Sequence, residues 1–229
     1  MSSSSPYSIK GGVLTVESPF PIEALDKLNA NENLRDIVAL EISRKSSTAW
    51  TVDASFMKER MNHYMFKQLL RLLPNLDTLS LKDSCLCESF VQLISCHLKV
   101  LRRLKIKNPF DIDDSFQDLL SNVKILDFEA SKIPMELLDG VEYSKSLVEM
   151  HLKIKNLSKH VLGLIIEAIE NNRSLLSVSI HTSKNGLYWF KQLLPKSYKC
   201  EYGSQVAIIE KASSDKRLHD TYAFLHVDF

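Results

Sequence analysis

One short apolar pattern returns along the chain and constrains its fold more than any other feature. The pattern is a hydrophobic residue, two residues of any kind, a second hydrophobic residue, one residue of any kind, and a third hydrophobic residue. Full copies occupy residues 37–42, 76–81, 101–106, 123–128, 147–152 and 175–180, and weaker copies with glycine in the first place occupy 11–16 and 203–208. Self-similarity of this kind indicates a repeat architecture.

The spacing of the copies limits which class of repeat the chain can form. The last hydrophobic residues of successive copies are 26, 39, 25, 22, 24, 28 and 28 residues apart. All but one of these steps fall in the range of roughly 20–29 residues that strand–helix repeats of the leucine-rich type use. The 39-residue step, between Ile42 and Leu81, predicts an insertion at about residues 43–75.

The segments between copies have helical periodicity, whereas the copies themselves alternate as strands do. Alternation turns the second and third hydrophobic residues of each copy inward, where a following helix buries them. We therefore expect an α/β fold with parallel strands on a concave face and helices on the convex face. The helices are predicted at residues 22–28, 56–73, 89–98, 114–120 and 160–169, the last with Ser158 as its N-cap.

Residues 168–180, AIENNRSLLSVSI, resemble the helix-to-strand junction of the leucine-rich-repeat family. The likeness is to the longer repeats of ribonuclease inhibitor and tropomodulin, and residues 25–34 are a looser copy of the same junction. The resemblance extends over residues 11–209. It implies one leucine-rich-repeat domain over residues 1–229, with about eight irregular repeats, the insertion at about 43–75 and a C-terminal cap at about 200–229.

One family position departs from its usual residue. The family places Asn or Cys three residues after the last strand hydrophobe, where its side chain bonds the backbone of the turn. Here those positions hold Lys45, Ser84, Pro109, Ser131, Lys155 and Ser183. Serine can supply part of that bonding, whereas lysine and proline cannot. The repeats are therefore irregular.

Composition excludes several classes of protein. The 29 basic and 28 acidic residues leave a net charge of +1, which favours neither nucleic acid nor an anionic membrane as a partner. No apolar run approaches the length that spans a bilayer. The start of the chain has no signal-peptide pattern, and the four cysteines form a poor disulfide framework. These features predict an intracellular protein, cytoplasmic or nuclear.

Catalytic and metal-binding motifs are missing from the sequence. Cys85, Cys87, Cys96 and His97 could ligate zinc, but their spacing does not match structural zinc sites. No nucleophile elbow, phosphate-binding loop or dinucleotide motif occurs. The acidic cluster of Asp111, Asp113 and Asp114 is typical of a helix start, because carboxylates favour helix N-termini. We therefore expect no enzymatic activity, no cofactor and no metal.

The outward positions of the predicted strands carry an unusual charge pattern. Residues 103, 105 and 107 of one strand are all basic, whereas the strand that follows is acidic at 127 and 129. Cross-strand pairing would explain this, at roughly 0.2–1 kcal/mol per pair. A footprint for a charged partner would also explain it, since repeat proteins bind through this face. The predicted binding residues are Arg103, Lys105, Lys107, Asp127, Glu129, Glu149 and His151.

The sequence thus predicts a non-enzymatic protein-interaction module, with a protein partner. Two alternatives stay open: a substrate receptor or adaptor of a ubiquitin ligase, and an RNA-associated scaffold. Nucleic acid is the minor alternative, because the acidic strand would repel phosphate and no aromatic residues are interleaved with the basic ones. The hydrophobic tail at residues 222–229 either caps the repeats or is offered to a partner. The oligomeric state is left open.

The repeat pattern generates a stability prediction. Leu104→Ala and Leu126→Ala should each lower the free energy of unfolding by roughly 2–5 kcal/mol, because both residues lie in the middle of the expected core. Chemical denaturation followed by circular dichroism measures the change. Thermal midpoints within about a degree of wild type for both variants would show that the strand register is misread.

Overall fold

A computed structural model of the chain describes residues 7–18, 20–30, 32–44, 55–84, 86–98, 101–110, 112–182, 189, 193, 198–202 and 207–211. Its helices are α1 (Ile22–Asn29), α2 (Ser55–Leu72), α3 (Glu88–His97), α4 (Phe116–Leu120), α5 (Met135–Tyr143) and α6 (Lys159–Asn171), with a 3₁₀ turn η1 (Glu32–Asp36). Its strands are β1 (Tyr7–Lys10), β2 (Val13–Ser18), β3 (Ala39–Arg44), β4 (Thr78–Lys82), β5 (Leu101–Lys107), β6 (Val123–Ala130), β7 (Glu149–Ile154), β8 (Ser177–His181), β9 (Tyr198–Tyr202) and β10 (Ala207–Lys211).

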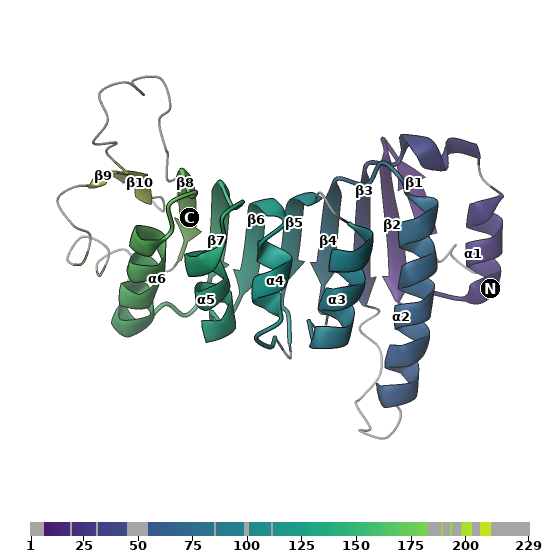
Figure 1. Ribbon diagram of the computed structural model, residues 1–229, viewed down its shortest axis with the longest axis horizontal. Helices are drawn as coiled ribbons and strands as arrows, with labels where there is room; N and C mark the ends of the chain where they lie inside the picture. The colour runs from purple at the N-terminus through teal and green to yellow at the C-terminus, as the bar shows by residue number, and fades with distance from the viewer. Residues whose placement is uncertain are drawn as a thin grey trace.

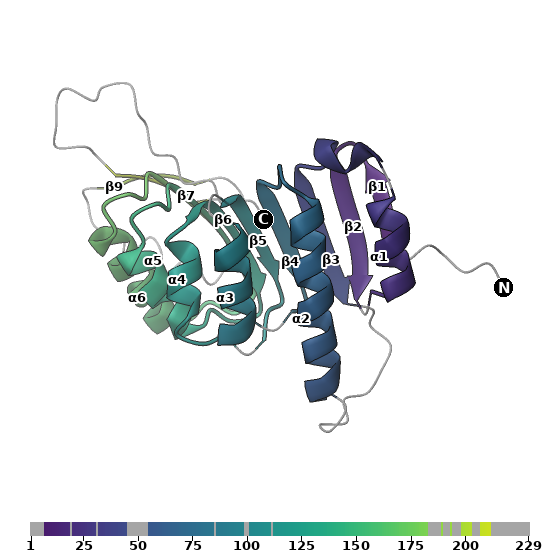
Figure 2. The same ribbon diagram turned by 45° about the vertical axis from the view of Figure 1, so that its right-hand side comes forward.

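The strands form one open sheet in which chain neighbours are spatial neighbours. The order is β1-β2-β3-β4-β5-β6-β7-β8-β10-β9, and every pairing from β2 to β8 is parallel. The labelled helices all lie on one face of this sheet, side by side (Figures 1 and 2). The predicted α/β class is confirmed. We call the other sheet face the open face, since no described helix covers it.

The two ends of the sheet differ from the expectation. β1 precedes the first copy and pairs antiparallel with β2 through a tight turn. Gly11 and Gly12 form that turn with φ of +57° and +77°, values that favour glycine because it lacks a Cβ. At the far end, the expected parallel strand over residues 203–208 is wrong. β10 begins at Ala207 and runs antiparallel to both β8 and β9.

The core lies between the sheet and the helices, and the strand alternation decides which residues enter it. The second hydrophobic residue of each full copy is completely or almost completely buried: Leu40, Leu79, Leu104, Leu126, Met150 and Val178. These residues are aligned by the parallel register, so they form a continuous row. Helices contribute the opposing layer, for example Leu162 and Ile165 of α6. The inward positions predicted from the sequence are therefore confirmed.

The predicted helix in the insertion is present as α2, which ends two residues before Pro74. Met65 and Leu69 are buried in the core, as the apolar stripe predicts. In the sequence, Phe56, Met57, Met61, Met65 and Leu69 form an apolar stripe along this helix that predicts packing on the repeats. The side chains of Phe56, Met57 and Met61 lie outside the described residues. The described part of α2 thus packs on the sheet like the helices that follow it.

Helix starts follow local capping chemistry. Ser158 caps α6, as predicted, by accepting a hydrogen bond from the backbone N–H of Val161 at 3.3 Å. Asp113 accepts bonds from the backbone N–H of Glu88, the first residue of α3, at 2.6 Å and from Ser115 at 3.1 Å. Asp113 of the acidic cluster therefore lies at a helix start, as predicted. It accepts from the first residue of α3 as well as from the residue directly before α4. α5, which the sequence did not predict, begins directly after Pro134.

Buried polar side chains hydrogen-bond the backbone where α5 and α6 each connect to the strand that follows. Asn172 is fully buried, and its Nδ2 donates to the backbone carbonyls of Val141 and Ser144. Its Oδ1 accepts from the backbone N–H groups of Ser174 at 2.8 Å and Leu175 at 2.7 Å. One unit earlier, the buried Ser144 hydroxyl donates to the carbonyl of Leu120 at 2.9 Å. Both residues lie three positions before the first hydrophobic residue of their copy.

After the C-terminal ends of β4 and β5, the chain turns through residues with positive φ. Asp83 and Asn108 each lie two residues after the last hydrophobe of their copy and adopt φ of 53° and 48°. The Asn108 amide donates to the Asp83 carboxylate at 3.2 Å, which links the two turns. Short polar side chains tolerate this left-handed conformation better than most. The turn-forming Asn is thus one position earlier than the family position expects.

The Asn172 junction generates a second prediction. Asn172→Ala should lower the free energy of unfolding by roughly 2–3 kcal/mol, because it leaves buried backbone groups without partners. The neighbouring Asn171→Ala is the matched control, since Asn171 makes one exposed bond to Glu142. That control should change the free energy by less than about 1 kcal/mol. Urea denaturation of both variants measures the difference, and equal losses would contradict the role assigned to Asn172.

Candidate functional site

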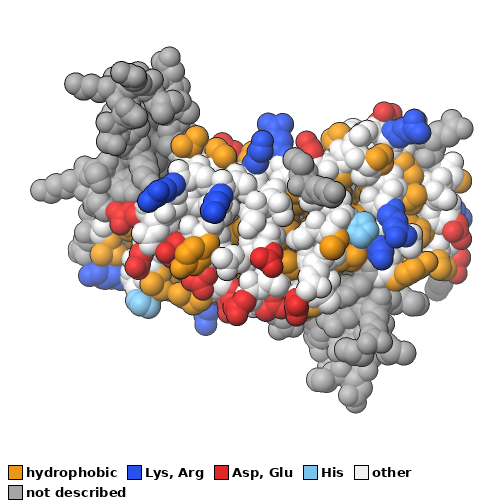
Figure 3. All heavy atoms as spheres, in the orientation of Figure 1, with side chains coloured by type: hydrophobic (Ala, Val, Ile, Leu, Met, Phe, Trp, Pro, Cys, Tyr) orange, Lys and Arg blue, Asp and Glu red, His pale blue; other side chains and the backbone are white. Residues whose placement is uncertain are grey.

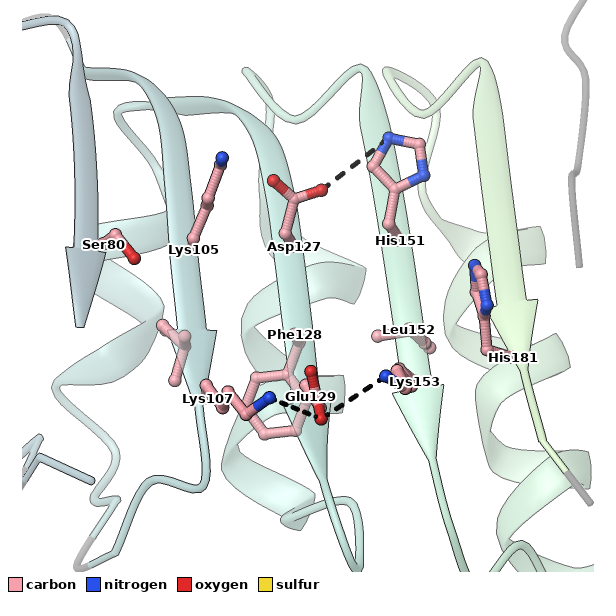
Figure 4. Close-up of a pocket in the computed structure, with 11 residues that line it drawn as sticks. Ser80, Lys105, Lys107, Asp127, Phe128, Glu129, His151, Leu152, Lys153 and His181 are labelled. Carbon is pink, nitrogen blue, oxygen red and sulfur yellow. Dashed lines mark ion pairs between the residues drawn. The ribbon is translucent and has the colours of Figure 1, made fainter. Parts of the chain in front are cut away.

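The candidate site is built from the outward positions of β4 to β8. Because successive side chains of a strand alternate between faces, the outward residues of neighbouring strands align in rows across the open face. One row runs Ser80, Lys105, Asp127, His151 and Ser179 by Cα register. The next runs Lys82, Lys107, Glu129, Lys153 and His181. Figure 4 shows most of these side chains on the same side of the sheet.

The carboxylates of β6 are paired with cations on both neighbouring strands. Glu129 Oε1 lies 2.9 Å from Lys107 Nζ and 3.5 Å from Lys153 Nζ (Figure 4). Asp127 Oδ2 lies 2.8 Å from Arg103 Nε, a diagonal contact to the preceding strand. This Arg103 nitrogen is shielded from solvent but makes no well-aligned hydrogen bond, so the contact is chiefly Coulombic. The predicted cross-strand pairing of β5 with β6 is confirmed.

His151 lies between two carboxylates. Its Nε2 is 3.9 Å from Asp127 Oδ1 and 3.9 Å from Glu149 Oε2. Its Nδ1 is within hydrogen-bond distance of the Ser179 hydroxyl, at 2.5 Å. The ring is thereby held between β6 and β8.

Two polar groups at the centre of this surface have no such partner. Within the described part of the chain, the Lys105 ammonium makes no ion pair and the Ser80 hydroxyl makes no hydrogen bond. Lys82, which is exposed and in register with Lys107, is likewise unpaired among the described residues. Lys105 extends away from the Glu129 pairs in Figure 4, beside Asp127 but without a contact to it.

A shallow hollow of about 270 Å³ opens on this surface. Its polar walls are formed by Ser80, Lys105, Lys107, Asp127, Glu129, His151, Lys153 and His181. Its floor is the strand segments that contain Ile106, Phe128 and Leu152, whose side chains turn to the core. The ion-paired side chains that line it stay accessible, from 26% exposed at Glu129 to 57% at Lys153. A hollow of this size accommodates one or two side chains of a partner.

The structure brings all seven predicted binding residues together on three adjacent strands. Arg103, Lys105 and Lys107 come from β5, Asp127 and Glu129 from β6, and Glu149 and His151 from β7. The predicted set omitted Ser80, Lys153 and His181, which also line the hollow. The strand alternation placed all three on the open face, so the signal was present. Their contribution depends on side-chain contacts that alternation does not reveal.

The surroundings of Glu129 shift the pKa of its carboxyl group. Burial raises the pKa of Glu129, but the hydrogen bonds and charges of Lys107 and Lys153 outweigh it, so the pKa is lowered from its ordinary value. Glu129 therefore stays ionised below the pH at which an unpaired glutamate takes up a proton. The negative charge of Glu129 between Lys107 and Lys153 is thereby kept to lower pH.

Other surfaces of the described chain offer less organised chemistry. The helix-covered face in Figure 3 carries hydrophobic, acidic and basic side chains that are interspersed. Cys87 and Cys96 are free thiols, while Cys85 and the side chain of Cys200 lie outside the described residues. Among the residues described, no three His, Cys, Asp or Glu side chains are placed to hold a metal ion. None of the helices described is both long and apolar enough to cross a bilayer.

Comparison with known proteins leaves the family open. No protein-family model matches the chain, and no curated protein matches it. Among solved structures, the chain is similar to the crystal structure of a Bacteroides fragilis protein determined as a structural-genomics target. That match has a TM-score of 0.43 and 13% sequence identity, and covers 78% of this chain and 72% of the other.

The Glu129 environment generates a third prediction. Removing the stronger cation contact by Lys107→Gln should raise the pKa of Glu129 toward its ordinary value, because one hydrogen bond and one nearby charge are lost. Carboxyl ¹³C NMR titration measures the pKa in both proteins. Since the folded-state pKa is depressed, the stability contributed by Glu129 is present above the unfolded pKa and decreases as pH falls through the folded value. An unchanged Glu129 titration in the variant would contradict the pairing.

Proposed function

We propose that the chain is a leucine-rich-repeat solenoid whose open face binds a protein partner without catalysing a reaction. The observation that carries the proposal is the ordered array of accessible, alternating charges across β5, β6 and β7. This array occupies the sheet face that no described helix covers, and the opposite face is packed with helices. The proposed binding residues are the seven predicted from the sequence.

The repeat assignment is supported by equivalence between units. Each of β3 to β7 places its second motif hydrophobe in register with that of the next strand. Helices follow the strands on one side throughout. Ser144 and Asn172 occupy the same position in successive units and bond the backbone of the preceding junction. Such nearest-neighbour stacking is the defining feature of solenoid proteins.

The binding assignment is supported by energetics. Each exposed ion pair stabilises a fold by about 0–1 kcal/mol, so folding alone does not require so many charges on one face. Complementary charge mainly sets the orientation and association rate of a partner. The change of sign between β5 and β6 would orient a partner across the strands. Asp127 and Glu129, on the central strand of this surface, disfavour the closely spaced phosphates of RNA.

Charge reversal tests the proposal. The double variant Arg103→Glu/Lys105→Glu should lose most of the partner recovered by affinity purification from native extract, because it inverts the basic strand. Its matched control is Lys124→Glu/Lys145→Glu, which makes the same change in net charge at two exposed lysines outside the proposed set. Quantitative mass spectrometry of the recovered proteins, with a melting curve for each variant, provides the measurement.

Three outcomes separate the alternatives. Loss of one protein partner in the test variant alone supports the proposal. Recovery of ribonuclease-sensitive complexes favours an RNA-associated scaffold, and recovery of cullin-type ligase subunits specifies an adaptor role. Equal recovery by wild type and both variants, with unchanged melting curves, would move the interface away from the open face.

A further inference from the structure

We propose that the partner anchors on the open face through a carboxylate side chain from an acidic segment, seated between Ser80 and Lys105. We call this place the carboxylate subsite. Lys82 and Lys107 flank it on the same two strands. This inference rests on the proposed protein-binding function and specifies the chemistry that the partner must present.

The first argument is the donor inventory. Ser80 and Lys105 are register partners on β4 and β5, so their side chains start about 4.8 Å apart on the same face. Within the described chain, neither has an acceptor. A hydroxyl and an ammonium group on neighbouring strands of one face can both donate hydrogen bonds to a carboxylate. Both residues also line the hollow that opens to solvent there.

The second argument is the charge balance between the strands. The carboxylates of the next strand are already paired, Asp127 with Arg103 and Glu129 with Lys107 and Lys153. On the other side, Lys82 lies directly opposite Lys107 in the register. Like charges placed directly opposite each other destabilise a sheet. An added carboxylate would relieve this repulsion and pair the cations that have no ion-pair partner among the described residues.

The third argument selects a carboxylate over a phosphate. Asp127 borders the subsite on one side, and Glu41 is in register with Ser80 on the other. A doubly charged phosphate group would be repelled by both more strongly than a singly charged carboxylate would. The outward positions of β4 to β8 also include no Phe, Tyr or Trp on which a nucleobase could stack. An acidic peptide segment therefore fits better than a phosphopeptide or RNA.

Peptide titration of the full chain tests the subsite. The probe is an acetylated and amidated peptide of alternating glutamate and glycine, added at low ionic strength and followed by ¹H–¹⁵N NMR. We expect saturable shifts centred on Ser80 and Lys105. Lys105→Gln should weaken binding about three- to fivefold, the range for one accessible charge pair. The matched control, Lys124→Gln, removes the same charge from an exposed lysine outside the hollow and should weaken binding less than about twofold.

Further comparisons in the same experiment show which results would overturn the subsite and which the proposed function. Equal weakening by both variants, or shifts spread over the whole surface, would overturn the subsite and show general charge attraction. Tighter binding of a matched phosphoserine peptide or of an oligouridylate would overturn the carboxylate assignment. If charge reversal abolishes partner capture while the glutamate peptide does not bind, the subsite fails and the proposed function stands. If the peptide binds through Lys105 but no partner depends on the open face, the subsite stands and the proposed function fails.

Discussion

The parallel register between neighbouring strands is the constraint on which the rest of this structure depends. Equivalent residues of neighbouring strands align from β3 to β8. Residues of one type that recur at the same position of each strand therefore form a row across the sheet. Inward positions become a continuous apolar row that the helices bury. Outward positions become rows of charge. The same backbone ladder that aligns Leu104 with Leu126 also sets Lys105 beside Asp127.

Charge pairing and partner binding on the open face are complementary rather than competing explanations. The carboxylates of β6 are held by Arg103, Lys107 and Lys153, which fixes their positions. Those pairs involve both carboxylates of β6 but not all of the neighbouring cations, and among the described residues Lys105 has no ion-pair partner. Under the proposed function, this surface would present its charge pattern to a partner already ordered. Preorganisation lowers the ordering cost of binding.

The sequence predicted the repeating parts of the fold well because they follow from periodicity. The apolar pattern located β2 to β8, and helical spacing located all of the described α-helices except α5. The antiparallel direction of β10 was not predictable. An apolar pattern such as that over residues 203–208 is the same in a parallel strand and in an antiparallel one. The turn over Asp83 and Asn108 was also missed, since the family position pointed one residue further on.

The candidate site was predictable only to the level of the residues that share a face. Alternation brought the seven predicted residues together, but it could not say which charges pair. Register alone would pair Arg103 with Ile125, whereas the long side chain reaches diagonally to Asp127. Likewise, whether Lys105 pairs with a described carboxylate depends on where the neighbouring side chains extend. These contacts depend on side-chain length and conformation, which a periodic pattern does not encode.

The open ladder of strands has a consequence for how the molecule loses structure. From β1 to β8 each strand pairs only with its immediate neighbours in the sheet, so the sheet can lose strands from either end, one after another. Amide hydrogen exchange in such an array is fastest at the margins and slowest in the interior. β5, β6 and β7 are interior strands with neighbours on both sides. The charged surface is thereby placed where transient fraying of the ends disturbs it least.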